Sequence, residues 1–341
     1  MTPSFFRGAL AAATLACSAV FATNAHAQES SRFSWEIEVE IGIDSVIDSD
    51  VPANELTDAF LAADIILGYE ITESVSIFAE FTLESVTGAT DDRAFEDLGL
   101  YVSELGLAFD LGGAELLVGK ISPAFGIAWD VAPGFYGANF AEDYELGEAL
   151  GAAISFDVGP GTLTASVFYF DDTELSRSLG TDRGRNTTAA GGAGNTGKFN
   201  NIAVQYDIEA GNTTFSISAS HLSAGVGDVK DQTGGALGFV YTVDDQFEII
   251  GEVAAFSGFG GTADSANYLT LGAALFRGPF TYSAAYTRRN ISSTGTDHIA
   301  SVGLDYTFEN DITLSSGLAY VDEGGVGSTN FGLSVIIPLG G

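Results

Sequence analysis

Apolar and polar residues alternate along most of the chain. In the segment 33–43 every odd-numbered residue is apolar, whereas Glu36, Glu38 and Glu40 stand between them. Successive side chains of a β-strand point to opposite faces, so this segment has one apolar and one acidic face. The same alternation recurs up to residue 339, and no helical period competes with it over a comparable length.

The alternating segments predict an all-β chain of about sixteen strands. Each segment is long enough for the roughly 9–11 residues with which a tilted strand crosses a bilayer. Their approximate bounds are 33–43, 60–71, 75–87, 97–110, 114–121, 147–158, 162–170, 198–209, 213–222, 235–243, 247–256, 267–276, 280–289, 298–308, 312–321 and 329–339.

Short and long connections follow one another in turn between these strands. Seven are tight and rich in Gly, Asn, Asp or Pro, such as 112–113 and 159–161. Eight are longer polar stretches: 44–59, 88–96, 122–146, 171–197, 223–234, 257–266, 290–297 and 322–328. Many aromatic residues lie close to the tight turns, as in an interfacial girdle. This asymmetry is typical of a transmembrane antiparallel β-barrel with short periplasmic turns and long external loops.

The N-terminal residues 1–27 predict a signal peptide. Arg7 precedes an uncharged stretch, and an A-x-A sequence predicts cleavage between Ala27 and Gln28. The barrel domain is then 28–341, and the only cysteine, Cys17, is removed; acylation of Cys17 as a lipoprotein is a weaker alternative. Export without disulfides indicates the envelope of a Gram-negative bacterium.

The net charge of the chain argues against a nucleic-acid partner. The chain has 46 Asp+Glu against 12 Lys+Arg, a net charge of −34. Such an excess of acid repels phosphate backbones, so we expect no nucleic-acid partner.

Catalytic chemistry finds little support in the sequence. Beyond the signal peptide only His221 and His298 remain, and neither belongs to a metal-binding spacing such as H-E-x-x-H. The acid pairs in loops, such as Asp91-Asp92, could bind Ca²⁺ but are more often simply solvated. We therefore expect no enzyme activity, no cofactor and no metal site.

The sequence resembles the general Gram-negative outer-membrane porins over its whole mature length. The resemblance rests on the sixteen-strand organisation and on a G-K-x-x-x-x-F-G segment, Gly119 to Phe125-Gly126, that enters the third long connection. It implies a homotrimer in the outer membrane, with the third loop folded into the pore. Porins commonly end on an aromatic residue, whereas this chain ends on Gly341.

If the apolar face contacts lipid, the opposite face lines the pore, and its charges set ion preference. Acids on the predicted pore wall are Glu36, Glu38, Glu40, Glu80, Glu84, Glu248 and Glu252. The third loop adds Asp130, Glu142, Asp143 and Glu145 at the constriction. By the same resemblance, Arg288, Arg289 and Lys120 are candidate wall bases. Alternatively, the two arginines pair with lipopolysaccharide phosphates or loop acids.

These observations favour a porin that lets small hydrophilic solutes and ions, chiefly cations, diffuse across the outer membrane. Its expected surroundings are outer-membrane lipid and lipopolysaccharide. Two alternatives remain: a substrate-specific channel for a chelate or an oligosaccharide, and a plugged barrel with a structural or adhesive role.

Overall fold

The computed structural model describes residues 32–244 and 246–341, which form a closed antiparallel barrel of sixteen long strands. This confirms the predicted fold class. The predicted signal peptide and its cleavage site at Ala27–Gln28 lie outside the described residues.

The long strands follow one another around the barrel in chain order. They are β1 (Phe33–Ser49), β2 (Thr57–Thr72), β3 (Val75–Ser85), β5 (Leu98–Asp110), β6 (Ala114–Ile121), β7 (Ala149–Val158), β8 (Gly161–Phe170), β10 (Asn201–Ala210), β11 (Thr213–Leu222), β12 (Gln232–Asp244), β13 (Phe247–Ser257), β14 (Ser265–Arg277), β15 (Phe280–Ile291), β16 (Gly295–Thr307), β17 (Thr313–Glu323) and β18 (Val326–Gly340).

The remaining elements are short and belong to the loops. They are η1 (Pro52–Asn54), β4 (Arg93–Ala94), α2 (Ala128–Val131), η2 (Asn139–Tyr144), η3 (Glu174–Ser176), β9 (Leu179–Gly180), η4 (Thr188–Ala190) and η5 (Phe259–Gly261). No helix in the described part of the chain is long and apolar enough to cross a membrane.

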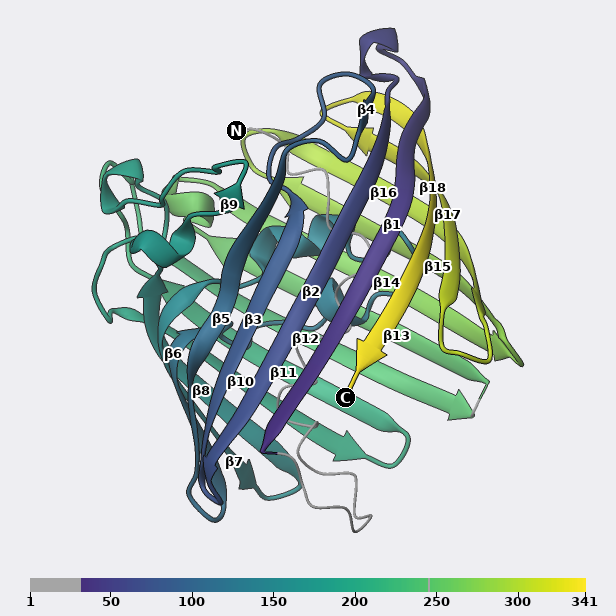
Figure 1. Ribbon diagram of the computed structural model, residues 1–341. Coiled ribbons are helices and arrows are strands. Elements are labelled where there is room, and N and C mark those ends of the chain that lie inside the picture. Colours follow the sequence, from purple (N-terminus) through teal and green to yellow (C-terminus); the bar gives the residue numbers. More distant parts are fainter. Residues whose placement is uncertain (1–31, 245) are drawn as a thin grey trace.

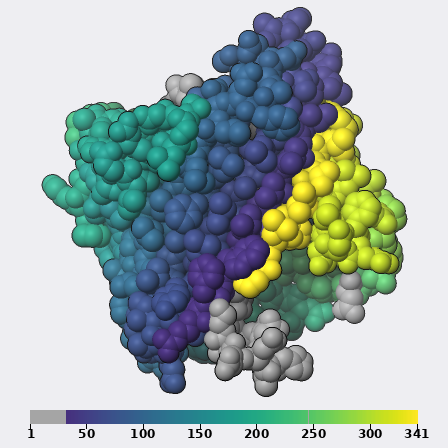
Figure 2. All heavy atoms as spheres, viewed as in Figure 1, coloured from purple at the N-terminus to yellow at the C-terminus, as the bar shows by residue number. Residues whose placement is uncertain are grey.

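The first and last strands close the barrel. β1 pairs with β2 on one side and with β18 on the other, and Ile41 lies opposite Val335. Figure 2 shows the purple N-terminal strand directly beside the yellow C-terminal strand. Closure leaves no free sheet edge, so every wall strand is hydrogen-bonded on both sides over at least part of its length.

The two faces of the wall differ as the alternation predicts. Outward apolar side chains are exposed, such as Val302 at 57% and Leu237 at 56%. Several inward acids on the same sheet are buried, and Glu40 is only 1% exposed. This inverts the arrangement of a water-soluble protein, because the apolar surface lies outside.

Tight turns gather at one end of the barrel and longer loops at the other (Figure 1). Two predicted long loops, 290–297 and 322–328, are shorter than predicted, because the strands on either side continue almost to the tip of each hairpin. β15 and β16 are joined by residues 292–294, and β17 and β18 by Gly324-Gly325. Both of these glycines have positive φ, +61° and +76°, as a two-residue hairpin requires.

β6 is the shortest wall strand, because the chain leaves the wall after Ile121. The upper part of β5 therefore has no partner from β6, whose pairing reaches only Leu105. Instead β9, from the loop between β8 and β10, pairs with Gly99 and Leu100. One loop turns into the barrel, and another fills the gap that it leaves in the wall.

Candidate functional site

The segment 122–148 between β6 and β7, called loop 3 below, folds into the interior of the barrel. Its helical turns α2 and η2 lie within the ring of strands in Figure 1. Its aromatic side chains are buried, with Phe125 at 1%, Phe135 at 4% and Tyr144 at 3% exposure. Loop 3 is thus packed like a protein core rather than held in water.

A row of glycines on the inward face of the far wall receives loop 3. We call Gly238, Gly272, Gly303, Gly317 and Gly332, on β12, β14, β16, β17 and β18, the glycine track.

Loop 3 touches the backbone of the glycine track. A Cβ on Gly272 would stand 2.5 Å from Cδ of Pro133, and one on Gly332 only 2.2 Å from Cε1 of Phe135. No real side chain tolerates such distances, so these positions need glycine for the loop to approach this closely. The glycines appear in the sequence as ordinary strand residues, and only the fold shows that they share a row.

Glu252 on β13 anchors the start of α2. Its carboxylate accepts the backbone N–H of Ile127 at 2.6 Å and of Ala128 at 3.2 Å. It also accepts the Tyr144 hydroxyl at 2.6 Å, and Glu252 itself is 3% exposed. The sequence predicted Glu252 as a pore-wall acid, but it is covered by the loop it holds.

Arg289 on β15 anchors the other end of loop 3. Its guanidinium pairs with Asp143 of loop 3 at 2.9 Å and with Asp297 of the wall at 2.9 Å, and it also binds Glu323. The guanidinium carbon lies 4.2 Å from the centre of the Phe140 ring. Arg289 therefore faces the interior as predicted by its parity, with three carboxylates around its charge.

A third contact joins loop 3 to β1. The Tyr136 hydroxyl donates to Asp44 at 2.6 Å. Burial, followed by the charge of Asp44, raises the pKa of Tyr136 well above its usual value. The phenol is a permanent donor at any physiological pH, and this contact is not broken by titration of the tyrosine.

Arg288 does not lie on the pore wall. It precedes Arg289 on the same strand, and adjacent residues of a strand point to opposite faces. Arg288 shares its face with the outward residues Tyr282 and Tyr286, and it hydrogen-bonds Thr296 at 3.4 Å. The predicted position of Arg288 on the pore wall is therefore wrong, because two consecutive strand residues cannot both face the interior.

Lys120 faces inward but contributes no open charge to a pore. Its side chain is 0% exposed, and its ammonium lies 2.8 Å from Glu148 and 3.1 Å from Asp171. The charge of Arg93 is likewise neutralised by an ion pair, with buried Asp58 at 2.6 Å. Both bases tie loops to the wall instead of facing a solute.

The inward face of β1, β2, β3 and β5 carries carboxylates at many positions, and we call it the acidic wall. Glu36 is exposed and Glu38 and Glu84 are half-buried, whereas the others are largely covered. Its members are Glu36, Glu38, Glu40, Asp64, Glu80, Glu84 and Glu104. Glu248 lies apart from them, inward on β13 and near its tight turn.

The four predicted loop 3 acids divide into two groups. Asp143 is bound by Arg289, and Glu142 is half-buried in η2 beside it. Asp130 and Glu145 interact with each other, and Glu145 also lies within electrostatic range of Glu80 on the acidic wall. Burial, followed by the charge of Glu145, raises the pKa of Asp130 to about 7. Carboxylates thus border the interior on both the loop side and the wall side.

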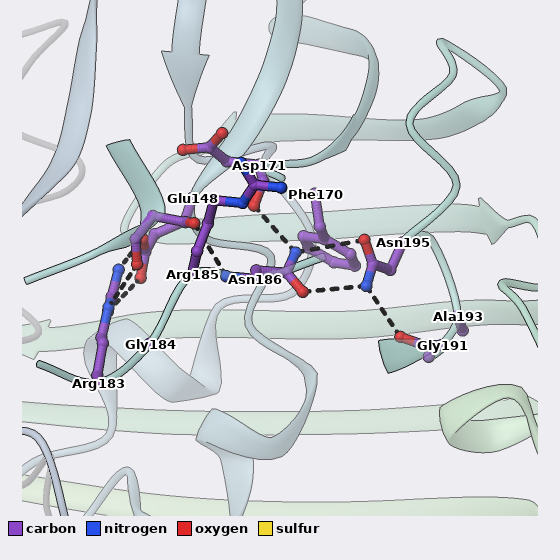
Figure 3. A pocket seen from close by; sticks show the side chains of 12 residues that line it. Glu148, Phe170, Asp171, Arg183, Gly184, Arg185, Asn186, Gly191, Ala193 and Asn195 are labelled. Atoms are coloured by element: carbon purple, nitrogen blue, oxygen red, sulfur yellow. Dashed lines mark hydrogen bonds and ion pairs between the residues drawn. The ribbon is translucent and has the colours of Figure 1, made fainter. Parts of the chain in front are cut away.

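A second polar assembly, not anticipated from the sequence, lies under the loop between β8 and β10. It surrounds a cavity of about 480 Å³ (Figure 3). Arg183 binds Glu148 through two hydrogen bonds, one of them 2.9 Å, and stacks 3.6 Å above the Tyr101 ring. Asn186 and Asn195 hydrogen-bond each other. These lining groups form hydrogen bonds with one another. Their role is therefore to pack this loop on the wall.

Within residues 32–244 and 246–341, no three His, Cys, Asp or Glu side chains are grouped so that they could hold a metal ion. His221 lies 3.9 Å from Asp231 at the loop end of β11, and both side chains are largely exposed.

Comparison with known proteins gives relatives in structure alone. No protein-family model matches the chain, and no curated protein sequence is similar to it. The outer membrane channel DcaP of Acinetobacter baumannii superposes with a TM-score of 0.61 at 11% identity, over 90% of this chain and 97% of that one. A mutant of Rh. blastica porin superposes with a TM-score of 0.59 at 15% identity, over 90% of this chain and 100% of that one.

A loop L8 deletion mutant of OmpT, an outer membrane protein of Vibrio cholerae, gives a TM-score of 0.57 at 10% identity, over 90% and 98%. At such identities the likeness is one of fold. The chain has the barrel architecture found in these outer-membrane proteins.

Proposed function

We propose that the chain forms an outer-membrane channel through which small hydrophilic solutes diffuse passively, with a preference for cations. The observation that carries this proposal is the charge of the interior. The exposed and half-buried members of the acidic wall and the pair Asp130–Glu145 present carboxylates from two sides. In contrast, Lys120, Arg93 and Arg289 are each held by carboxylates.

Such an arrangement favours cations for a simple electrostatic reason. A low-dielectric wall that carries one sign of charge concentrates the opposite ion and repels its counterpart. The effect is greatest at low salt, where the Debye length is about 30 Å at 0.01 M. No opposing row of open bases is present among the described inward residues named above, so the field is not balanced across the interior.

The outer surface supports a location in a membrane. Exposed apolar side chains surround the barrel, as with Leu271 at 47% and Leu318 at 45%. The channels to which the fold is similar are outer-membrane proteins. We therefore place the chain in the outer membrane of a Gram-negative bacterium, among lipid and lipopolysaccharide; a homotrimer is an expectation from the porin resemblance.

The inward aromatic residues named here pack against other rings and form no open row for an oligosaccharide. Phe256 and Tyr268 are 5% and 3% exposed, and both pack on Tyr144 of loop 3. Phe168 and Phe170 share the inward face of β8, but they pack on each other, and Phe168 is 0% exposed. A general diffusion channel fits this interior better than a sugar-specific one.

Conductance of the purified protein in planar bilayers tests the proposal. Stepwise insertions with a constant open conductance are expected, and the current should persist for many seconds at low voltage. A protein that inserts but conducts no current at any voltage would be a plugged barrel and would overturn the proposal.

A further inference from the structure

The outward face of β14 to β17 changes character towards the loop end of the barrel. Neighbouring residues on these strands form rows across the sheet, fixed by the strand register. The row of Leu271, Tyr286, Ala300 and Tyr320 is apolar and aromatic. The next row is Leu269, Arg288, His298 and Asp322, and the one beyond is Asn267, Asn290 and Thr296.

The apolar part of this face covers most of the height of a membrane interior. From Phe280, in the aromatic row beside the tight turns, to Arg288 the strand advances eight residues, or about 26 Å before tilt is considered. A strand tilt of about 35–45° reduces this height to about 20 Å, which is most of the roughly 25 Å apolar band of an outer-membrane barrel. Arg288 and His298 therefore stand where the apolar belt ends.

Arg288 is an unusual residue for this face. Its only hydrogen bond to a described side chain is the long one to Thr296, at 3.4 Å. In contrast, Arg289 on the same strand is held by three carboxylates. Arg288 thus keeps most of its guanidinium donors available on the outer surface.

His298 lies directly opposite Arg288 on the neighbouring strand. Its Nδ1 is 2.7 Å from the Tyr286 hydroxyl, and the two rings stack with centroids 6.0 Å apart. When Tyr286 donates to Nδ1, the proton of the neutral imidazole is on Nε2, which then acts as a donor. Arg288 and His298 together present donors to one point of the outer surface.

We propose that Arg288 and His298 bind the phosphate of a lipid headgroup in the membrane leaflet at the loop end of the barrel. An Arg guanidinium binds phosphate through two parallel hydrogen bonds, and His298 adds a third donor. The proposal rests on the proposed function, because it requires that the barrel spans a membrane with its loops outside.

The surface below the pair explains why the phosphate belongs to a lipid. Tyr320 is 55% exposed, Val302 57% and Leu318 45%. These side chains form an apolar patch, called the apron below, which acyl chains cover when the headgroup is bound at Arg288. A free phosphate ion gains nothing from this apron, so a lipid binds more tightly than the ion.

Asp322 is the nearest carboxylate in this row. It lies opposite His298 in the register of β16 and β17, on the side away from Arg288. It therefore flanks the site and leaves the Arg288 side of His298 open.

Binding of defined lipids to the purified full chain in detergent, followed by native mass spectrometry, tests the site. The probes are a monophosphoryl lipid A, the same lipid after removal of its phosphate, and inorganic phosphate as competitor. Wild type should bind the phosphorylated lipid about tenfold more tightly than the dephosphorylated one, as expected for charge-assisted hydrogen bonds. Arg288→Gln should abolish most of this preference, and His298→Ala should reduce it by a smaller factor.

The matched control is Arg277→Gln, an arginine on the same outward parity of β14 but at the tight-turn end. It should keep the wild-type preference. An unchanged preference in Arg288→Gln would overturn the site, as would equal competition by inorganic phosphate. Loss of oligomer in Arg288→Gln without change in lipid preference would instead assign Arg288 to a contact between copies of the chain, and would also refute the proposal.

The channel proposal fails separately. Arg288 faces away from the interior, so a protein that conducts no current in planar bilayers can still show the lipid preference, and a conducting protein can lack it.

Discussion

Two regions of the inner wall have different roles. The region formed by β12 to β18 carries the glycine track and binds loop 3 through backbone contact and the anchors Glu252 and Arg289. The region formed by β1, β2, β3 and β5 carries the acidic wall and holds loop 3 only through Asp44 among the contacts described above. The first region makes most of the contacts that fix where the loop lies, and the second provides the charge that the loop acids then face. Charge counted along the sequence does not distinguish an anchoring acid from an acid that acts on ions.

Removal of the Arg289 anchor should have the largest effect. Arg289→Met removes the cation that Asp143, Asp297 and Glu323 share, and loss of one member of a buried ionic network costs about 3–5 kcal/mol. The free energy of unfolding in lipid, measured with urea and tryptophan fluorescence, should fall by about that amount. Arg277→Gln is the control and should leave it unchanged. A loss below about 0.5 kcal/mol in Arg289→Met would show that loop 3 does not depend on this anchor.

Filling the glycine track should displace loop 3 with a smaller loss of stability. Gly332→Ala puts a methyl group 2.2 Å from the Phe135 ring, and overpacking of this kind costs about 1–3 kcal/mol. The single-channel conductance should change, because the loop must move away from the wall. Gly235→Ala is the control, since a Cβ there meets only Ser218 O at 3.5 Å. Identical conductance in wild type and Gly332→Ala would contradict close packing of the loop on the track.

The pair Asp130–Glu145 should make the charge preference depend on pH. The pKa of Asp130 is raised to about 7 by burial and by Glu145, so its carboxylate is ionised above that pH and protonated below it. The cation-to-anion permeability ratio should therefore fall as the pH is lowered from 8 to 6. In Asp130→Asn the change of the ratio between pH 8 and pH 6 should be smaller than in wild type. A change as large as that of wild type in this variant would assign the pH dependence to other groups.

Glu248 offers the smallest expected effect. It lies inward on β13 near the tight turn, away from the acidic wall and from loop 3. Glu248→Gln should therefore change the permeability ratio much less than Asp130→Asn, as read from reversal potentials in the same salt gradient. A larger change in Glu248→Gln would place the selective region at the tight-turn end.

Alternation predicted the fold well because it is a local signal. The period of two sets which face each residue occupies, and tight turns mark the ends of strands. The same rule, applied strictly, excludes Arg288 from the pore, since its neighbour Arg289 faces inward. Strand ends were less predictable: Gly295 to Asp297 read as loop residues, yet they continue the β15–β16 hairpin.

Partners of the inward charges could not be predicted from the sequence. Lys120 meets Asp171, and Arg289 meets Asp143, only after loops have folded back onto the wall. The glycine track joins residues from five strands and becomes visible only when the register is known. Local patterns thus identify faces, whereas long-range contacts decide which charges stay open.

The zero-current potential across a tenfold KCl gradient tests the central claim most directly. The claim is that carboxylates dominate the interior because its bases are neutralised by ion pairs. Wild type should show a potential of cation-selective sign, and the double variant Asp130→Asn/Glu145→Gln should move it towards zero while the barrel stays folded. A potential of anion-selective sign in the wild type would contradict the account.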